Sequence, residues 1–229
     1  MSAAGFLAGF GSGRRRAHSP RALFISGFAL ALAALVALAE RRVESFGAAS
    51  RSLLGIVFGL LVPVALVATS GQVSFPLRLA TSASFFARFG ASRRAVALGM
   101  VVASMATAAV LAAAMGAVTA VIAHDPSAPP VASDALTTAW IGLLTGAAYA
   151  ALFALGSTFG ARGGGRYWAL ALDFLLGSGG ATAVVMPRGH AQNLLGGAPP
   201  LMLSQPASAA ALLAIAAVMT LLALARLPP

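Results

Sequence analysis

Six long apolar runs, separated by short connections that carry most of the charge, constrain this chain more than any other feature. The first run, residues 22–39, is just long enough at about 1.5 Å per residue to cross a bilayer core of about 30 Å. Across the chain 59% of residues are hydrophobic and only 9% are charged, whereas an ordinary globular domain has about 25% charged residues. We therefore expect an all-α membrane protein with a single transmembrane domain over residues 1–229. The expected spans are residues 22–39, 53–69, 95–123, 135–160, 167–187 and 207–225.

The first run also has features of a signal peptide. Residues 1–21 are glycine-rich and basic, and Ala37-Leu38-Ala39 stands before Glu40 as a cleavage site would. The run is long for the apolar region of a signal, and further spans follow it. We therefore interpret residues 22–39 as the first span and residues 1–21 as a cytoplasmic or interfacial segment ahead of it.

Arginine placement predicts the orientation of the six spans. With both termini inside, inner segments hold eleven arginines and outer segments hold four, which agrees with the positive-inside rule. The discordant outer link carries Arg41, Arg42 and Arg51, for which Glu40 and Glu44 offer local partners. The net charge of +10 does not indicate a nucleic-acid partner, because the arginines are spread over short connections and form no basic domain.

Lysine and cysteine are both missing from the sequence. Without lysine the chain has no phosphate-binding lysine of a Walker A loop, so any ATP that drives it is bound by another chain. Without cysteine it has neither a disulfide framework nor a thiolate metal site. His18, His124 and His190 lie in three different connections, and no metal site or cofactor site is expected.

Residues 74–99 form a polar-tinged interval with four arginines and no acidic residue. A helix beginning near Ser74, with Pro76 tolerated in its first turn, is expected to be amphipathic. Its apolar stripe, interrupted only by Ser82, is Phe75, Leu79, Phe86 and Phe89. Gly90 then ends this helix and Ser92 is placed to cap the next one. Such a segment suits a membrane surface or a partner's groove; the alternative is a loop whose arginines only fix orientation.

Small residues recur at helical spacing in several runs. The pairs Gly55/Gly59, Gly142/Gly146 and Gly156/Gly160 are separated by three residues, and Gly99, Ala103 and Thr107 share a face. Such patterns indicate close helix packing more often than a substrate path. Pro63 is expected to kink the second span.

Asp173 is the acidic residue that falls inside an expected span, and ionisable groups at membrane depth are by default functional. The alternative is a shallow Asp173 that pairs with Arg162 or Arg166, or reaches interfacial water. The same span is weakened by its glycines and ends at Pro187. Residues 188–206 are apolar enough to dip into the membrane and too broken to cross it, which suggests a re-entrant segment.

Ser178, His190 and Asn193 invite comparison with an intramembrane serine protease. The pattern fits poorly, because Leu176 stands where the first glycine of Gly-x-Ser-Gly belongs and the histidine follows the serine. His190 is more readily interpreted as orienting the bend after Pro187, with a place in an outer vestibule as the alternative. Asp125 and Asp134 flank a proline-containing loop, where turn and cap roles explain them.

The whole pattern resembles the membrane subunit of a type-2 ATP-binding-cassette exporter. The resemblance rests on residues 5–21 as an entrance helix, FPLRLATSASFFARFGASRRAVALG as a coupling region and PRGHAQNLLGGAPPLMLSQPAS as an outer hairpin. It implies a non-enzymatic permease of the bacterial inner membrane, with cytoplasmic termini and a separate ATP-binding subunit, pairing as a homodimer or with a second permease. The implied ATPase contacts are Arg78, Phe85, Phe86, Arg88, Phe89, Arg93 and Arg94. The implied pathway residues are Asp173, Ser178, His190 and Asn193.

Two other classes remain open from the sequence. A structural or assembly subunit of a membrane complex would also use an amphipathic loop and one buried acid. An integral membrane enzyme is less well supported, because no catalytic constellation is evident. The substrate is not specified by any motif.

Overall fold

The computed structural model describes residues 2–43, 47–73, 77–87, 90–124, 130–178 and 180–227, with the side chains of residues 73, 87 and 161 excepted. Throughout these ranges the chain forms helices and no strand, which confirms the all-α prediction. The elements are α1 (Ala3–Ala17), α2 (Pro20–Val43), α3 (Ala48–Ser50), η1 (Arg51–Leu61), α4 (Val62–Val73), α5 (Leu79–Ala87), α6 (Arg93–Ile122), α7 (Val131–Gly156), η2 (Ala161–Gly163), α8 (Gly165–Leu176), η3 (Ala181–Val185), α9 (Pro187–Leu194), η4 (Pro200–Met202) and α10 (Gln205–Ala225).

Within the described ranges, five helical segments are long and apolar enough to cross a membrane. They are Pro20–Val43, Ala48–Gln72, Arg93–Ile122, Val131–Gly156 and Gln205–Ala225. Five of the six expected spans are thereby matched by a helix, and the chain has the character of a multi-pass membrane protein. The first two helices extend beyond the expected spans at both ends, α6 and α10 begin two residues earlier, and α7 begins and ends four residues earlier than expected.

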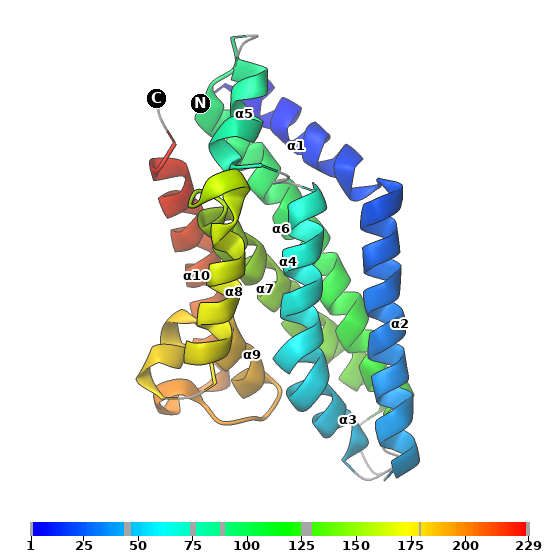
Figure 1. The fold of residues 1–229 in the computed structure, drawn as a ribbon. Coiled ribbons are helices and arrows are strands. Elements are labelled where there is room, and N and C mark those ends of the chain that lie inside the picture. Colours follow the sequence, from blue (N-terminus) through cyan, green and yellow to red (C-terminus); the bar gives the residue numbers. More distant parts are fainter. Residues whose placement is uncertain are drawn as a thin grey trace.

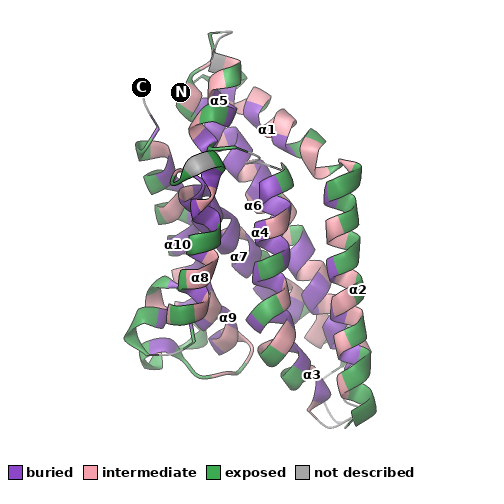
Figure 2. Ribbon diagram, viewed as in Figure 1, coloured by how far each residue is buried: buried purple, intermediate pink, exposed green. Residues whose placement is uncertain are grey.

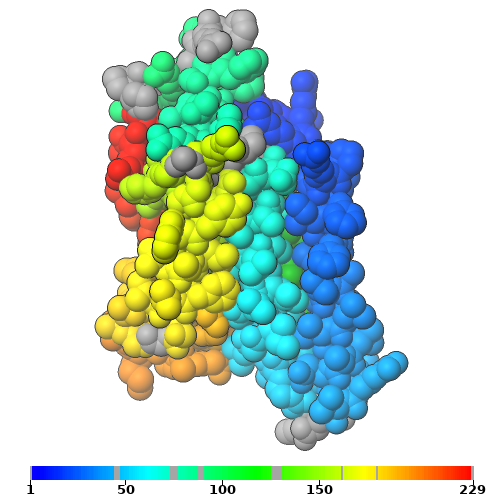
Figure 3. Space-filling view, viewed as in Figure 1, coloured from blue at the N-terminus to red at the C-terminus, as the bar shows by residue number. Residues whose placement is uncertain are grey.

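The bundle is built around α6 and α7, with the other long helices at its edges (Figure 1). Buried positions concentrate on α6 and α7, whereas α2 and α8 show exposed positions along their length (Figure 2). On one face, α8 lies beside α4 and α2 lies at the opposite edge (Figure 3). The two termini lie at the same end of the bundle as α5 (Figure 1).

The fifth expected span, residues 167–187, is not one helix, and this prediction was wrong. α8 has 12 residues, about 18 Å at the helical rise, which is too short to cross a bilayer core. Gly180 adopts φ 75°, a conformation that interrupts a right-handed helix and that glycine tolerates. The chain continues as η3 and restarts at Pro187, where the missing N–H of proline suits the first helical position. Residues 165–185 therefore form a discontinuous element made from α8 and η3.

Glycine pairs bring α6 and α7 into backbone contact. A Cβ atom added at Gly142 would lie 2.6 Å from the Cα of Ala113, and one at Gly146 would lie 2.4 Å from the carbonyl oxygen of Ala108. These distances leave no room for a side chain, so the glycines set the approach of the two helices. The packing role expected for Gly142 and Gly146 is confirmed.

The same device holds α1 against α6. Gly5, Gly9 and Gly13 are the buried positions of α1. A Cβ at Gly9 would meet the Val96 carbonyl oxygen at 2.0 Å, and one at Gly99 would meet the Phe6 carbonyl oxygen at 2.2 Å. The small-residue face of α6 therefore packs on α1, and residues 3–17 are an integral part of the bundle.

The Gly55/Gly59 pair has no such role within the chain. A Cβ at Gly55 would meet nothing within 4 Å, and one at Gly59 would meet the carbonyl oxygen of Leu54 in its own helix. At Pro63 the effect is a change of helix type: η1 is a π-helix that gives way to the α-helix α4 at Val62. Proline has no N–H to continue the ladder, so this is where the pattern of backbone hydrogen bonds can change.

Two of the three discordant arginines have local partners at the end of the bundle opposite α5. The Nε of Arg51 lies 3.0 Å from Glu40 Oε2, the pairing that the sequence suggested. Nη1 of Arg41 donates to the carbonyl of Ile122, the last residue of α6, at 3.0 Å. A cation is favourable at a helix C-terminus, which accounts for an arginine in this connection independently of orientation. Glu44 lies outside the described residues.

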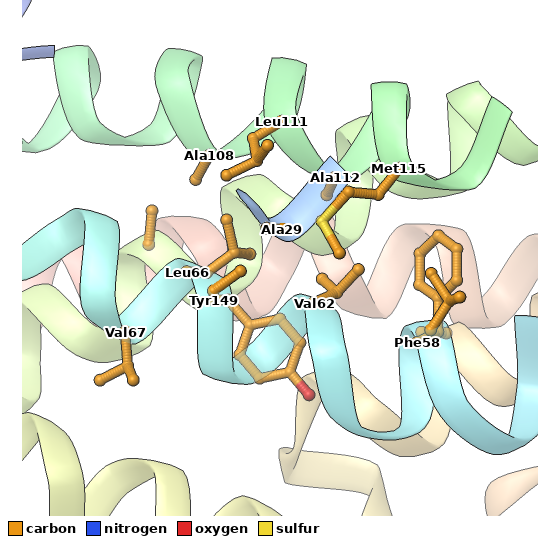
Figure 4. Close-up of a cluster of buried hydrophobic side chains, with 14 of the residues drawn as sticks. Ala29, Phe58, Val62, Leu66, Val67, Ala108, Leu111, Ala112, Met115 and Tyr149 are labelled. Carbon is orange, nitrogen blue, oxygen red and sulfur yellow. The ribbon is translucent and has the colours of Figure 1, made fainter. Parts of the chain in front are cut away.

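The main core joins α2, η1, α4, α6 and α7. Phe58, Val62 and Leu66 pack with Met115 and its neighbours on α6 (Figure 4). Tyr149 of α7 is fully buried at the edge of this cluster, and its hydroxyl points away from the labelled aliphatic side chains (Figure 4). A buried phenol needs a hydrogen-bond partner, and that partner defines the candidate site.

Candidate functional site

The centre of the candidate site is the carboxylate of Asp173 on α8. The Tyr149 hydroxyl donates to Asp173 Oδ2 at 2.6 Å, and the backbone N–H of Arg188 donates to Asp173 Oδ1 at 3.3 Å. Asp173 is 0% exposed, so both oxygens are satisfied by protein groups. This burial contradicts the alternative in which the Asp173 side chain reaches interfacial water.

Local sequence explains why Asp173 points inward. Arg166, Ala169 and Asp173 are buried and recur at helical spacing on α8, whereas Trp168 and Leu175 are 75% and 74% exposed. The helix thus presents apolar side chains outward and its charged side chains to the bundle. This inverted pattern suits a helix with one face toward lipid.

Asp173 also anchors the restart of the chain at α9. Because Pro187 is the first residue of α9, the Arg188 N–H is the first backbone donor of that helix, and Asp173 accepts from it. The Arg188 guanidinium lies 5.1 Å from the centroid of the Phe174 ring. Three elements, α7, α8 and α9, therefore meet at one carboxylate.

A second polar network closes the hairpin between α8 and α10. His190 Nε2 lies 2.8 Å from the Val184 carbonyl oxygen, so this nitrogen donates, and Nδ1 lies 3.1 Å from Ser208 Oγ. The Asn193 amide Nδ2 donates to Ser208 Oγ at 2.8 Å and to the Leu203 carbonyl at 2.9 Å. His190 and Ser208 are fully buried and Asn193 nearly so. The network fixes η3, α9 and the start of α10 together.

This network supports the orienting role expected for His190 and not a place in an open vestibule. Ser178 is exposed, and the hydroxyl beside His190 belongs to Ser208. With Nε2 held by a backbone carbonyl and Ser208 Oγ accepting from Asn193, the arrangement is that of a satisfied structural network. The structure brings His190 and Asn193 together and leaves Ser178 apart from their hydrogen bonds.

Two residues of these networks were missed in the sequence. Tyr149 carried a signal that was overlooked, since it is a phenol within an apolar run and such a hydroxyl needs a partner. Ser208 carried little signal, because serine in the first turns of a helix is common for local reasons.

The α5 segment is helical as predicted, and the described positions of the predicted stripe, Leu79, Ser82 and Phe86, lie on its more buried side. Leu79, Ser82 and Ala83 are buried, Phe86 is half-buried and Phe85 is 61% exposed. The helix begins at Leu79, and the expected positions Ser74, Phe75, Pro76, Arg88 and Phe89 lie outside the described residues.

α5 is attached to the bundle by an apolar cluster. Leu79 and Ala83 pack with Val96, Ala97 and Met100 of α6 and with residues of α7 and α10. Arg78 Nε donates to the Gly160 carbonyl in the turn after α7. Both connections rest on buried or hydrogen-bonded groups, so α5 is held to the ends of α6 and α7.

The two arginines that follow α5 begin α6. Ser92 precedes them in extended conformation without a side-chain cap hydrogen bond, so the capping role expected of its hydroxyl is not seen. Arg94 is exposed and Arg93 is half-buried. Arg94, with Phe85 of α5, therefore lies on the surface at the end that holds both termini.

Among the described residues, no group of three or more His, Asp or Glu side chains could hold a metal ion. A scan against protein-family models, a search of curated proteins and a search of solved structures each found no match to this chain. The exposed face of α5 and the hydrogen-bonded carboxylate of Asp173 are therefore the features from which a function is inferred.

Proposed function

We propose that this chain is the membrane-spanning permease subunit of an ATP-binding-cassette exporter, driven by a separate ATP-binding subunit. The observation that carries the proposal is the attachment of α5. A short helix at the end with both termini exposes Phe85 while Leu79 and Ala83 fasten it to α6. A surface helix joined in this way passes a push from a partner to the bundle.

The transmitted movement has a defined route through α6 and α7. Backbone contact at Gly142 and Gly146 makes these two helices move as one body. Displacement of α5 therefore shifts α7, which carries Tyr149. The discontinuous α8 to α9 segment is the part able to respond, because it has short helices in place of a continuous ladder.

The Asp173 centre is the proposed pivot of that response. Tyr149 and the start of α9 share one carboxylate, so a shift of α7 relative to α8 strains or exchanges these hydrogen bonds. By this account Asp173 couples movement of α7 to the hairpin of residues 177–204, with His190 and Asn193 keeping the hairpin intact. The pathway lies beside this hairpin, and its substrate remains unspecified.

A structural subunit of a membrane complex is the second candidate. The observation that favours it is that Asp173 is fully buried and its carboxylate is hydrogen-bonded within the chain, which is all that a static anchor requires. The two candidates differ in the partner that each requires.

Surface substitutions on α5 and α6 test the first candidate. Phe85→Glu with Arg94→Glu should abolish co-purification of the ATP-binding subunit while leaving membrane insertion unchanged. Arg42→Glu is the matched control. Arg42 lies in the last turn of α2, at the end of the bundle opposite α5 (Figure 1), and its substitution should leave association unchanged. Equal co-purification by both variants would remove the coupling role from α5.

A further inference from the structure

A groove on the outside of the bundle combines an apolar floor with a basic rim. It has a volume of about 480 Å³ and lies between the end of α1, the first half of α2 and the middle of α6. Leu23, Leu30, Val110 and Leu111 line its apolar part, and Arg14 and His18 line its rim. α1 runs obliquely across the end of the bundle and meets the start of α2 beside this rim (Figure 1).

Backbone packing of α1 creates the groove and fixes the rim. Because Gly9 and Gly13 lie against α6, the axis of α1 comes close to α6. The last turn of α1 lies beside the start of α2 (Figure 1). The His18 Nδ1 donates to the Arg14 carbonyl at 2.8 Å. This bond orients the imidazole and leaves Nε2 as the ring nitrogen available to a ligand.

The rim has no acidic counterpart close by in the sequence. Arg14 lines the groove, and Arg15, Arg16 and Arg21 lie within seven residues of it in the chain, whereas Glu40 is the first acidic residue of the chain and stands near the far end of α2. No acidic residue occurs in α6. At about 1.5 Å per residue, some 30 Å separates the start of α2 from Glu40. A negatively charged ligand is therefore suited to balance the positive charge of the rim.

We propose that this groove binds an anionic phospholipid of the bilayer, with its phosphate at Arg14 and His18 and one acyl chain along Leu23, Leu30 and Val110. The rim lies where lipid headgroups would be expected, because a helix of membrane-spanning length begins at Pro20, within a few residues of Arg14 and His18. Basic residues beside a membrane surface attract anionic headgroups. The apolar floor distinguishes a lipid from a small soluble anion, and the surplus of arginine distinguishes an anionic from a zwitterionic headgroup.

The site has a consequence for α1 that is separate from transport. A lipid seated there contacts α1, α2 and α6 together, so it reinforces the attachment of α1. Because ligands that bind only the folded state stabilise it, the lipid raises the thermal stability of the purified protein. The inference depends on the chain spanning a membrane and not on the identity of any ATPase.

Native mass spectrometry in a non-ionic detergent tests the proposal directly. Purified protein is titrated with dioleoylphosphatidylglycerol or with dioleoylphosphatidylcholine, and bound lipid is counted. The wild type should retain the anionic lipid several-fold better. Arg14→Gln with His18→Gln should lower that retention by roughly fivefold or more, because loss of the Arg14 charge alone is worth about 1 kcal/mol, without affecting the zwitterionic lipid.

Matched variants separate the headgroup from the groove. Arg42→Gln removes an exposed arginine at the far end of α2 and should leave retention unchanged. Ala106→Trp fills the groove from an exposed position of α6 and should lower retention of both lipids, whereas Leu213→Trp on exposed α10 should not. Equal retention of the two lipids by the wild type, or an equal loss in Arg42→Gln, would overturn the site. Displacement of the lipid by millimolar glycerol 3-phosphate would also overturn it, because a free anion would then suffice.

Discussion

The hydroxyl of Tyr149 lies 2.6 Å from Oδ2 of Asp173, and this bond joins α7, a helix of the rigid core, to the short helix α8. The other carboxylate oxygen accepts from the first backbone donor of α9. Asp173 thus holds together a segment that lacks a continuous helical ladder. The buried carboxylate therefore anchors the resting arrangement of α7, α8 and α9.

Tyr149→Phe should destabilise the protein by about 1 to 3 kcal/mol, because a buried carboxylate loses its hydroxyl donor without gaining water. Tyr167→Phe is the matched control. Tyr167 is 55% exposed, so its change should stay within about 0.5 kcal/mol. The measurement is chemical or thermal unfolding in a fixed detergent, and equal effects at the two tyrosines would contradict the assigned bond.

Combining Tyr149→Phe with Asp173→Asn should be non-additive. Two residues in direct contact have interaction energies of about 0.5 to 3 kcal/mol, and here the first substitution removes much of what the second could remove. Unfolding free energies of the two single variants and the double variant give this coupling. Strict additivity would mean that the 2.6 Å contact carries no energy of its own.

Glycine to alanine substitutions on α1 should have opposite signs at neighbouring positions. Gly9→Ala places a Cβ 2.0 Å from the Val96 carbonyl oxygen, so α1 must separate from α6 and stability should fall by about 1 to 3 kcal/mol. Gly11→Ala meets nothing within 4 Å and should stabilise the helix by about 0.5 to 1 kcal/mol. Thermal unfolding of the pair is the test, and destabilisation by Gly11→Ala of the same size would argue against the close approach.

Asn193→Asp should destabilise the hairpin between α8 and α10. The substitution keeps the size of the side chain but replaces the amide that donates to Ser208 and to the Leu203 carbonyl with an acceptor. We expect a loss of about 1 to 3 kcal/mol. Gln72→Glu makes the same chemical change at an exposed position of α4 and should have little effect. Limited proteolysis within residues 195–204 would report the loosening, and protection equal to wild type in Asn193→Asp would contradict it.

Asp173→Asn should lower ATP turnover coupled to transport in the assembled complex at normal expression. An amide cannot accept from both Tyr149 and Arg188 with its two terminal atoms, so the proposed pivot loses one of its bonds. The measurement is ATPase activity of the purified complex in liposomes. Wild-type turnover in a correctly folded variant would leave Asp173 with a structural role alone.

The long helices were predictable because their signal is redundant. In α6 and α7 every turn is apolar, so errors of a few residues at the ends do not alter the assignment. The contact faces were also readable, since Gly142 and Gly146 have few reasons to recur other than close packing. The packing of α1 on α6 was not readable from residues 1–21, because the buried positions of α1 are glycines and no apolar stripe reveals them.

The discontinuous segment shows where periodicity stops being informative. Composition over residues 167–187 is apolar enough for a span, and it is Gly180, in a left-handed conformation, and Pro187 that divide it. Whether a chain passes such residues by kinking or by restarting depends on partners elsewhere. Here the partner is Asp173, which supplies an acceptor to the first donor of α9.

The sequence predicted several residues of the candidate site but not their hydrogen-bond partners. Asp173, His190 and Asn193 stand out as polar residues in apolar surroundings, but their partners Tyr149 and Ser208 are distant in sequence. On α5 the expected stripe holds at Leu79 and at its polar interruption Ser82, and the neighbouring Ala83 is buried as well.

The most direct test of the central proposal is affinity purification from the native host in mild detergent, with mass spectrometry of stoichiometric partners and an ATPase assay. The account predicts a partner with a Walker A motif, ATP turnover by the complex, and loss of both on Phe85→Glu with Arg94→Glu. Recovery of the protein alone, or in an assembly without a nucleotide-binding subunit, would contradict it and favour the structural role.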